Sequence, residues 1–575
     1  MSGMQSLYVG LSGIQSNSNA LNTTAHNIAN VNTEGYVRQQ VVYKDTAYNN
    51  VATTSAINTG QRGQGVGILE IAHVRDMFLD AQYRKESGRQ AFYENMYDSV
   101  YEIETHLGEL DGVAYQDTLT GLLNSLNELT ATPTDQTAVS GLVQAATAFI
   151  DRSKSIYNGL LDYQNTLNQN VIDITDRINQ IGQRIVELNE RITKIEAGNI
   201  ENANGLRDER DLLIDELSTY GKINVKEYAN KSVYISFENI PLVDDTEFYQ
   251  MGLETIPGTD LVEPVWPALG NQAVYNLNVE ICTEDNTDVG GLKGLLAARG
   301  SVTPTFETLT EPDPDDYVTT TYTDGTQNPE YIKAQAAYER YLTSEKSSPL
   351  VVAMANFDKL VNSVVTQIND ILCPEKTVTV GGQEYTVLDT DKASMAADGT
   401  YGVELFTRNY CDRYVATTLS DGNTYYVRND ISTFGNASAY TVTNVTVNSE
   451  ILQDFSKMPL HTAEGEEDYD KAKAMVALFD QDLLQYNDGN DSLTFEEFYE
   501  QMTLDMADRG SIYKSMADNE TTLANALDSE RQEVMSVSSD EELSNMIRYQ
   551  QAYGASSRYI NVITEMLDSL IAMVG

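Results

Sequence analysis

Histidine and cysteine are the side chains of this sequence best suited to bind a metal or to act as a base or nucleophile. The four histidines lie far apart, and none has a ligand or base at motif spacing; they are His26, His73, His106 and His461. The three thiols form neither a disulfide framework nor a zinc spacing; they are Cys282, Cys373 and Cys411. The sequence therefore predicts no metal and no cofactor, with these side chains in structural or surface positions.

Two segments resemble ligand-binding loops, but their spacing fails. The glycine cluster at residues 63–67 lacks the third glycine of a dinucleotide loop. Residues 488–496 suggest a calcium loop, yet placing Gly489 at the invariant turn puts apolar and aromatic side chains where ligands belong. A helix start capped at Ser492 or Thr494 explains this segment better.

The balance of charge excludes several classes of partner. Acidic residues number 86 and basic residues 37, so the formal net charge is −49. Such a chain is unsuited to nucleic acid, whose phosphates are bound by clustered Lys and Arg, and to an anionic membrane surface. No pair of carboxylates stands out for glycoside hydrolysis, so we expect no catalytic residue and no enzyme activity.

The ends of the chain favour long helices and lack targeting signals. All 12 prolines lie between Pro133 and Pro459, so helix breakers are absent from both ends. There is no apolar run long enough for a transmembrane helix. The first basic residue is Arg38, so no secretory signal is expected, and export would leave the first residues uncleaved.

Both ends carry an apolar stripe that alternates steps of three and four residues, the spacing of a coiled-coil seam. We expect the two stripes to pair and to form an assembly interface. Its candidate residues are Leu7, Leu11, Ile14, Leu21, Ile28, Tyr549, Tyr553, Ile560, Ile563, Leu567 and Leu570. The alternative is that each helix packs separately on a globular core.

The polar face of the first helix carries Ser, Thr, Asn and Gln but no Glu–Lys pair. Ser, Thr and Asn are weak helix formers, so this helix should be marginal alone and become ordered when its stripe finds a partner. Since burying a charge is costly, an uncharged outer face suits burial among neighbouring subunits.

A third heptad run, in residues 167–195, predicts a long rod-like helix. Its Leu, Val and Ile residues step four and three throughout. A helix over residues 160–197 would be about 57 Å long and would end at Gly198 and Asn199. We expect its partner to be an antiparallel neighbour in the same chain rather than a second copy.

Strand patterns interrupt the helical ones, and turn residues separate them. Helices are predicted at residues 83–129, 134–167, 291–299, 350–372 and 467–540, and strands at 68–74, 223–242 and 377–447. We therefore expect a mainly α fold with β-rich outer domains, in which the ends lie together and the middle projects.

Three domains follow from this pattern. They are a terminal coiled-coil assembly domain (1–40 and 541–575), a helical-bundle domain (41–222, 288–372 and 463–540, with 301–349 an exposed acidic insertion) and one or more β-rich outer domains (223–287 and 373–462).

The end of the first helix carries a specific signature turn. Its residues are Asn27, Asn30, Asn32, Thr33, Gly35 and Tyr36. This pattern resembles the N-terminal signature of the flagellar rod, hook and hook-associated proteins. Residues 74–84 and 290–299 resemble the hook-associated members, and residues 538–553 resemble the closing motif of the family, although Ser538-Ser539 stands where the family usually has a Val-Asn pair.

The resemblance implies a structural protein at the junction between the flagellar hook and filament, required for filament assembly and exported through the type III pathway of the flagellum to an extracellular position. It implies that the terminal helices line an inner tube while the middle domains face outward. The implied partners are the flagellar hook protein, the second hook-associated junction protein (type 3), copies of the chain itself in a ring and a flagellar export chaperone.

Two alternatives remain. The nearer is another axial protein, either hook protein or flagellin. The length of the chain and the heptad run at 167–195 argue against hook protein, whose body is expected to be mostly β. The farther is a secreted enzyme with a catalytic β-domain at residues 375–460, which a cleft holding two close carboxylates would favour.

Overall fold

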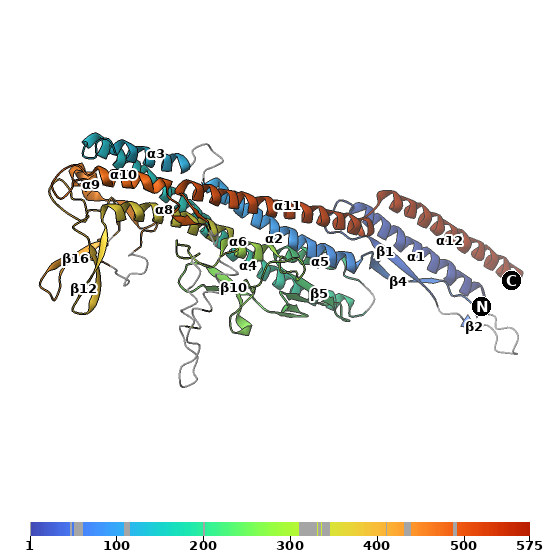
Figure 1. Ribbon diagram of the computed structural model, residues 1–575. Helices are drawn as coiled ribbons and strands as arrows, with labels where there is room; N and C mark the ends of the chain where they lie inside the picture. The colour runs from blue at the N-terminus through green and yellow to red at the C-terminus, as the bar shows by residue number, and fades with distance from the viewer. Residues whose placement is uncertain are drawn as a thin grey trace, which may run out of the picture.

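The computed structural model shows an elongated molecule in which long helices run along the axis and small sheets project from the side (Figure 1). It describes residues 2–46, 49–50, 61–107, 115–198, 202–309, 331, 335, 346–409, 411–429, 439–486 and 491–574. Both termini lie at one end of the molecule (Figure 1). Most of the predicted insertion at 301–349 lies outside the described residues.

The first and last helices pack against each other at this end. Helix α1 (Ser2–Ala29) runs antiparallel to α12 (Ser539–Val574), and α12 packs mainly on α1. A two-stranded antiparallel sheet of β1 (Gln39–Asp45) and β4 (Val66–His73) lies against α1. The short strands β2 (Asn49–Asn50) and β3 (Gln61–Arg62) pair beyond it. We call the described residues from 2 to 76 and from 539 to 574, which include α1, α12, β1 and β4, the terminal unit, and the rest of the described chain the body.

Two long helices extend from the terminal unit along the body. They are α2 (Met77–Leu107) and α11 (Phe495–Met535), which pack along each other. The helix predicted at 83–129 is therefore wrong in its bounds: it begins at Met77 and is followed by a separate helix, α3 (Tyr115–Leu129). Thr494, one of the two residues predicted as a cap, caps the start of α11 in a capping box with Glu497.

The rod-like helix is longer than predicted. Helix α4 (Gln136–Glu196) has 61 residues, which corresponds to about 90 Å. The predicted segments 134–167 and 160–197 both belong to this helix, because no proline interrupts it. Gly159, near its middle, leaves room for the contact with α2. A Cβ at Gly159 would lie 2.7 Å from Nδ1 of His106.

The heptad stripe of α4 is largely buried within the chain, as predicted. Along its whole length, α4 contacts several elements rather than one antiparallel helix: α3, α5 (Asn204–Tyr220), α6 (Gly291–Arg299), α8 (Pro349–Leu372) and nearby strands. The main core lies where α3, α4, α8 and α11 meet. There the ring of Tyr115 contacts Phe149, Phe357 and Tyr499.

One group of outer strands packs on the second half of α4. A four-stranded sheet has the order β5 (Ile223–Glu227), β6 (Val233–Phe237), β7 (Ile240–Asp244) and β8 (Glu247–Phe248). A three-stranded sheet has the order β11 (Gln272–Ala273), β10 (Val262–Trp266) and β9 (Gly252–Thr255). The 3-10 turn η1 (Pro267–Leu269) lies between β10 and β11.

Three asparagines of α4, about three turns apart, hold these strands through side-chain amides. Asn179 exchanges two hydrogen bonds with the backbone of Met251, one in each direction. Asn189 does the same with Val233. Asn168 accepts from the N–H of Val262. Polar positions directly beside the apolar stripe thus fix the register of the outer strands on the helix.

A second group of strands lies at the far end of the molecule. The sheet order is β12 (Glu375–Val380), β13 (Gln383–Leu388), β16 (Thr424–Arg428) and β15 (Tyr414–Thr418), and the labelled β12 and β16 strands project from the axis (Figure 1). Strands β14 (Phe406–Arg408) and β17 (Val445–Val447) form a separate pair.

The helix predicted at 467–540 is interrupted. It begins with α10 (Tyr469–Ala477) and the turn η6 (Leu478–Asp480), after α9 (Ser449–Gln453) and η5 (Phe455–Lys457). The pair β18 (Leu484–Gln485) and β19 (Ser492–Leu493) then precedes α11. The predicted fold class is nevertheless confirmed: the chain is mainly α, with paired terminal helices, a long helical body and β-rich outer regions.

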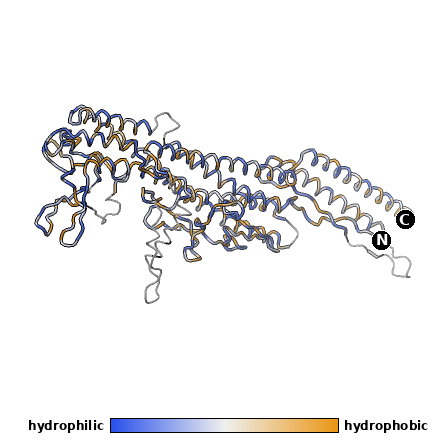
Figure 2. Tube along the Cα trace, viewed as in Figure 1, coloured by the Kyte–Doolittle hydropathy of each residue, from blue (hydrophilic) through white to orange (hydrophobic). Residues whose placement is uncertain are grey.

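Hydrophobic and hydrophilic residues alternate along the helices, including the terminal pair (Figure 2). Within the described residues, no helix is both long and apolar enough to cross a membrane.

Candidate assembly interface

Glycines let the two terminal helices approach closely. A Cβ at Gly10 would lie 2.5 Å from Cγ1 of Ile560, and one at Gly13 would lie 2.7 Å from Oγ of Ser556. Larger side chains at these positions would force the helices apart. The contact fixes the antiparallel register of the terminal pair, in which early residues of α1 meet late residues of α12.

The predicted stripe residues lie along this pair, but the single chain does not bury them fully. The half-buried ones are Leu7, Ile14, Leu21, Ile28, Tyr549, Ile560, Ile563 and Leu567. The exposed ones are Leu11, Tyr553 and Leu570. The pair therefore covers only one side of each helix and leaves apolar surface free.

Further exposed apolar residues were not among the candidates. Met4 continues the heptad stripe of α1 toward the N-terminus, and the others lie beside the stripe rather than on it. Met566 and Ile571 of α12 are 60% and 69% exposed. Val562 and Met573 on α12 and Met4 and Tyr8 on α1 are also exposed. The available signal was a helix with apolar residues on more than one face. We call these six residues, together with Leu11 and Leu570, the outer apolar face.

Part of the polar face of α1 is buried within the chain itself, so the expected burial among neighbouring subunits stays a prediction only for the exposed residues of this face. Ser16, Thr23, Thr24 and Asn27 are buried in the chain itself. The β1–β4 pair lies on α1, and Ser12 Oγ accepts a hydrogen bond from a backbone N–H of β4 at 3.3 Å. Short polar side chains suit this contact because they can bond the backbone groups of the adjacent strands.

Asn27 is the centre of the signature turn. Its Nδ2 donates to the carbonyl of Gln39, and its Oδ1 accepts from the N–H of Gln39 and from the hydroxyl of Tyr36 at 2.7 Å. Burial raises the pKa of Tyr36, and the charges of Asp208 and Glu542 raise it further. The tyrosine is therefore a neutral donor at ordinary pH.

The other signature residues shape the turn. Asn30 Nδ2 donates to the carbonyl of His26, and the hydroxyl of Thr33 donates to Oδ1 of Asn30. Gly35 has φ +74°, a left-handed conformation that favours glycine. Asn32 is exposed, and nothing in the structure explains its identity.

Arg38 connects the turn to the start of α12, a role that sequence reasoning did not assign. Its guanidinium lies 2.8 Å from Glu542 and 2.9 Å from Glu541. Its backbone N–H donates to the carbonyl of Met535, the last residue of α11. Nearby, the hydroxyl of Tyr43 on β1 is hydrogen-bonded to that of Tyr549 on α12, and burial together with this contact raises the pKa of Tyr43 to about 12.

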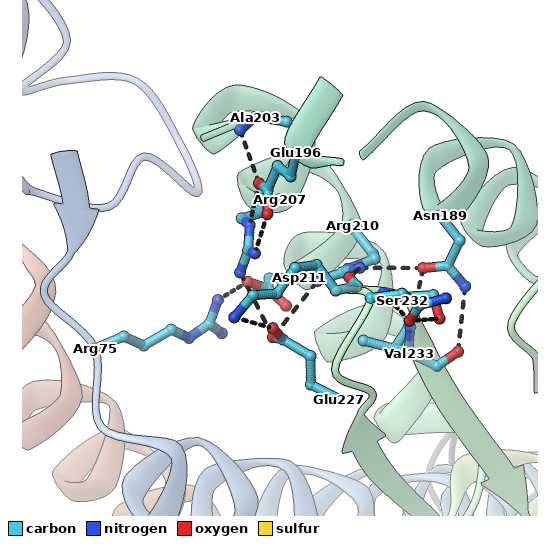
Figure 3. Close-up of polar contacts among 12 residues, drawn as sticks. Arg75, Asn189, Glu196, Ala203, Arg207, Arg210, Asp211, Glu227, Ser232 and Val233 are labelled. Carbon is cyan, nitrogen blue, oxygen red and sulfur yellow. Dashed lines mark hydrogen bonds and ion pairs between the residues drawn. The ribbon is translucent and has the colours of Figure 1, made fainter. Parts of the chain in front are cut away.

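A network of ion pairs joins the terminal unit to α5 of the body. Arg75, just after β4, bonds both Asp80 and Asp211. On the same helix, Arg207 bonds Glu196 at the end of α4 (Figure 3). The buried Arg210 donates to Asn189 and thereby links α5 to the outer strands (Figure 3). An open cavity of about 1110 Å³ lies beside this network, between β4, α5 and β6.

The remaining candidates for chemistry stay apart. Each histidine lies on a different segment, and in the parts of the chain that the structure describes no three His, Cys, Asp or Glu side chains are placed to hold a metal. The three cysteines are free thiols. The suspected calcium loop includes residues 487–490, which lie outside the described residues.

Two carboxylates of the distal β-region, Glu404 and Glu375, have structural partners. Glu404 accepts a hydrogen bond from the hydroxyl of Tyr440, and burial raises its pKa to about 7. Glu375 is bonded by Arg413 and Arg428. These contacts account for both groups as parts of the packing rather than as an acid–base pair.

Three family models match the chain. The one described as flagellar hook-associated protein FlgK helical domain matches residues 100–311. The one described as flagella basal body rod protein matches residues 7–36, and the one described as flagellar basal body rod FlgEFG protein C-terminal matches residues 529–573. The second and third matches cover the helices of the terminal pair.

Curated relatives match over nearly the whole length. Flagellar hook-associated protein 1 of Bacillus subtilis is 25% identical over 97% of this chain and 95% of its own. The protein of the same name from Salmonella typhimurium is 23% identical over 98% of each chain. The solved flagellar hook junction protein FlgK of Burkholderia pseudomallei matches 80% of this chain and 100% of its own with a TM-score of 0.50 and 12% identity, which supports the fold.

Proposed function

This chain belongs to the flagellar hook-associated protein 1 family, and from this premise we propose that copies of it assemble through their terminal units into a ring between hook and filament. The chain is a structural protein of the bacterial flagellum and assembles with other flagellar components. Its family is a structural one, and we propose that the chain has no catalytic activity of its own.

The outer apolar face is the observation that carries this proposal. It lies on helices that already pair within the chain, so a partner must cover it. Exposed apolar patches of this kind mark protein–protein contacts. An open hollow of about 540 Å³ at α1 is lined by Tyr8, Leu11 and Tyr559, among others. We propose that helices of neighbouring copies fill it.

The small number of charges near this face, and their near-zero sum, favour close packing of copies. Residues 1–37 contain one charged residue, Glu34, and residues 546–575 contain two basic and two acidic ones. The acidity of the chain therefore belongs to its middle. Since like charges repel, a tube of terminal units with an acidic middle facing outward keeps the repelling groups apart and solvated.

We propose finer partners in line with the family. They are the flagellar hook protein on one side, the second hook-associated junction protein (type 3) on the other, and an export chaperone before assembly. We also propose an extracellular position in the flagellum, reached through type III export with the first residues retained. The division into terminal (1–40, 541–575), helical (41–222, 288–372, 463–540) and outer β-rich (223–287, 373–462) domains remains a proposal.

Deletion of the gene tests the proposed function. Electron microscopy of the deletion strain should show hooks without filaments, with filament protein lost to the medium. A plasmid copy of the wild-type gene is the control and should restore filaments. Normal filaments on the deletion strain would contradict the proposed function.

A further inference from the structure

Where the terminal unit meets the body, two buried polar atoms face each other, and neither has a hydrogen-bond partner among the residues that the structure describes. They are Nε2 of His73, at the end of β4, and Oδ1 of Asp208, on α5, and they lie 3.5 Å apart. If both atoms presented lone pairs, they would repel each other and remain unsatisfied. A single proton between them would satisfy both.

The pair lies inside the contact that holds the terminal unit on the body. The backbone N–H of Val37, next to the signature turn, donates to the carboxyl of Asp208. Asn202 and Asn204, which precede and begin α5, both donate to the carbonyl of Ile71 on β4. Separation of the terminal unit from α5 would therefore expose the pair to water.

Charged groups of every adjacent element face the pair. They are Arg75 after β4, Glu196 on α4, and Arg207 and Asp211 on α5, with the hydroxyl of Tyr36 nearby. Arg75 is bound by Asp80 and Asp211, and Arg207 by Glu196. The nearest cations are therefore engaged with other carboxylates, and Asp208 forms no ion pair with an arginine or lysine among the described residues.

We propose that His73 and Asp208 share one proton when the terminal unit is docked on α5, that this proton resides on the carboxyl, and that the exchange makes docking insensitive to moderate acid. The directions in which the two pKa values are shifted agree with a proton on the carboxyl. Burial and Asp211 raise the pKa of Asp208 to about 7. Burial and the two nearby arginines lower the pKa of His73 to about 4.

The linkage between docking and pH follows from the number of bound protons. In an undocked, solvated pair the histidine has a pKa of about 6.5 and the aspartate about 3.9, so between these values the proton is on His73. Docking moves it to Asp208. The docked and undocked states each bind one proton, so the docking constant does not change with pH in this window.

Each residue alone would give a slope of opposite sign. A carboxyl with a raised pKa favours docking at low pH, and this contribution is lost as the pH rises from about 4 to 7. A histidine with a lowered pKa opposes docking in acid, and this penalty disappears as the pH rises from about 4 to 6.5. The inference concerns the isolated chain and does not depend on the proposed function.

Histidine NMR on the full-length wild-type chain tests the proton's position directly. With only four histidines, ring-labelled protein gives a countable spectrum, and His73→Gln identifies the relevant resonance. We expect His73 to stay neutral down to about pH 5 and to sense a neighbouring titration near pH 7. Titration of His73 near pH 6.5 would overturn the proposal.

Variants of the two residues test whether their opposite effects on the pH dependence of docking cancel in the wild type. Protection of residues 34–43 from hydrogen exchange, corrected for the intrinsic effect of pH, measures docking between pH 4.5 and 6.5. The protection of the wild type and that of the exposed control variant Glu70→Gln should depend on pH in the same way. Asp208→Asn keeps an acceptor for Val37 and should lose protection toward acid, by up to about tenfold per pH unit.

His73→Gln should instead lose protection as the pH rises over the same window, relative to the wild type. Slopes of both variants that parallel the wild type would overturn the proposal. If Asp208→Asn does not fold, the wild-type NMR titration and the His73→Gln slope still decide it.

Discussion

Nε of Arg38 lies 2.8 Å from Oε1 of Glu542, although 504 positions separate the two residues in the chain. The ion pair closes the base of the terminal pair, where the signature turn meets the start of α12. It explains why a motif after the first helix and a motif at the start of the last helix occur together: each supplies one half of the same contact.

Removal of Arg38 should loosen this base. Glu542 is 2% exposed, so Arg38→Ala leaves its carboxylate buried without its main partner, at a cost of roughly 1–3 kcal/mol. Hydrogen exchange of residues 36–43 and 535–545 should report faster opening. Glu541→Gln is the control because Glu541 is 62% exposed, and it should change little. Equal effects of both variants would contradict the assignment.

Asn189 should be essential for attachment of the outer strands to α4. Its fully buried amide donates to the carbonyls of Val233 and Asp245 and accepts a hydrogen bond from Arg210. Asn189→Ala leaves buried donors and acceptors unpaired and should destabilise the fold by roughly 2–4 kcal/mol. Urea unfolding followed by tyrosine and tryptophan fluorescence measures this.

The matched control for that variant is Asn165→Ala, an exposed asparagine on the same helix. We expect it to change the free energy of unfolding by less than about 0.5 kcal/mol. A tolerant Asn189 would mean that the strands are held by apolar packing alone.

Glu404 should make the distal β-region less stable as the pH rises. Its folded pKa is raised to about 7 from the ordinary 4.5. The stability gained from the protonated form is complete below pH 4.5 and is lost as the pH rises to about 7. Glu404→Gln should remove this loss and raise stability at pH 8 by about 1–3 kcal/mol.

Melting curves between pH 5 and pH 8 measure that effect. Glu384→Gln, on an exposed residue of β13, is the control and should follow the wild type. A Glu404→Gln variant with the same pH profile as the wild type would show that the carboxyl is ionised without penalty.

The isolated chain should be a monomer whose ends are the first parts to be cleaved. The terminal pair has exposed apolar faces, and α12 packs mainly on α1, so its helices gain little stability from the body. Limited proteolysis should remove roughly 30 to 60 residues from each end and leave a stable acidic core. Ends as resistant as the core would contradict this.

Much of the helical framework could be predicted from the sequence because its signals are local. The heptad run of α4 and the bounds of α6 and α8 follow from apolar period and breaking residues. The contacts between distant segments could not be predicted in this way. Nothing near Ser16 or Thr24 in the sequence indicates that the strands at residues 39–73 cover them.

The polar contacts of Asn189, and those between the terminal unit and the body, could not be predicted either. Asn189 appears in the sequence as a polar residue in a helix, and only the position of β6 shows what it bonds. His73 and Asp208 are 135 residues apart in number, and their pairing depends on how β4 meets α5. The outer apolar face was missed in part because a heptad pattern selects one stripe, whereas α12 has apolar residues beside that stripe.

The central claim is that the terminal pair is an assembly surface and not part of the folded core of the body. Charge on α12 tests it, since a buried charge costs several kcal/mol while the loss of a single aliphatic contact costs about 1.5–3 kcal/mol. Ile563→Asp and Leu567→Asp act on the stripe, and Met566→Asp acts on the outer apolar face. Asn561→Asp, on an exposed polar position of the same helix, is the matched control.

The most direct measurement combines electron microscopy of flagella from strains carrying these variants with thermal melting of the purified proteins. We predict melting within a few degrees of the wild type for all four, hooks without filaments for the three apolar-to-Asp variants, and normal filaments for Asn561→Asp. Normal filaments and swimming with Met566→Asp and Leu567→Asp would contradict the claim, as would a body that melts far below the wild type.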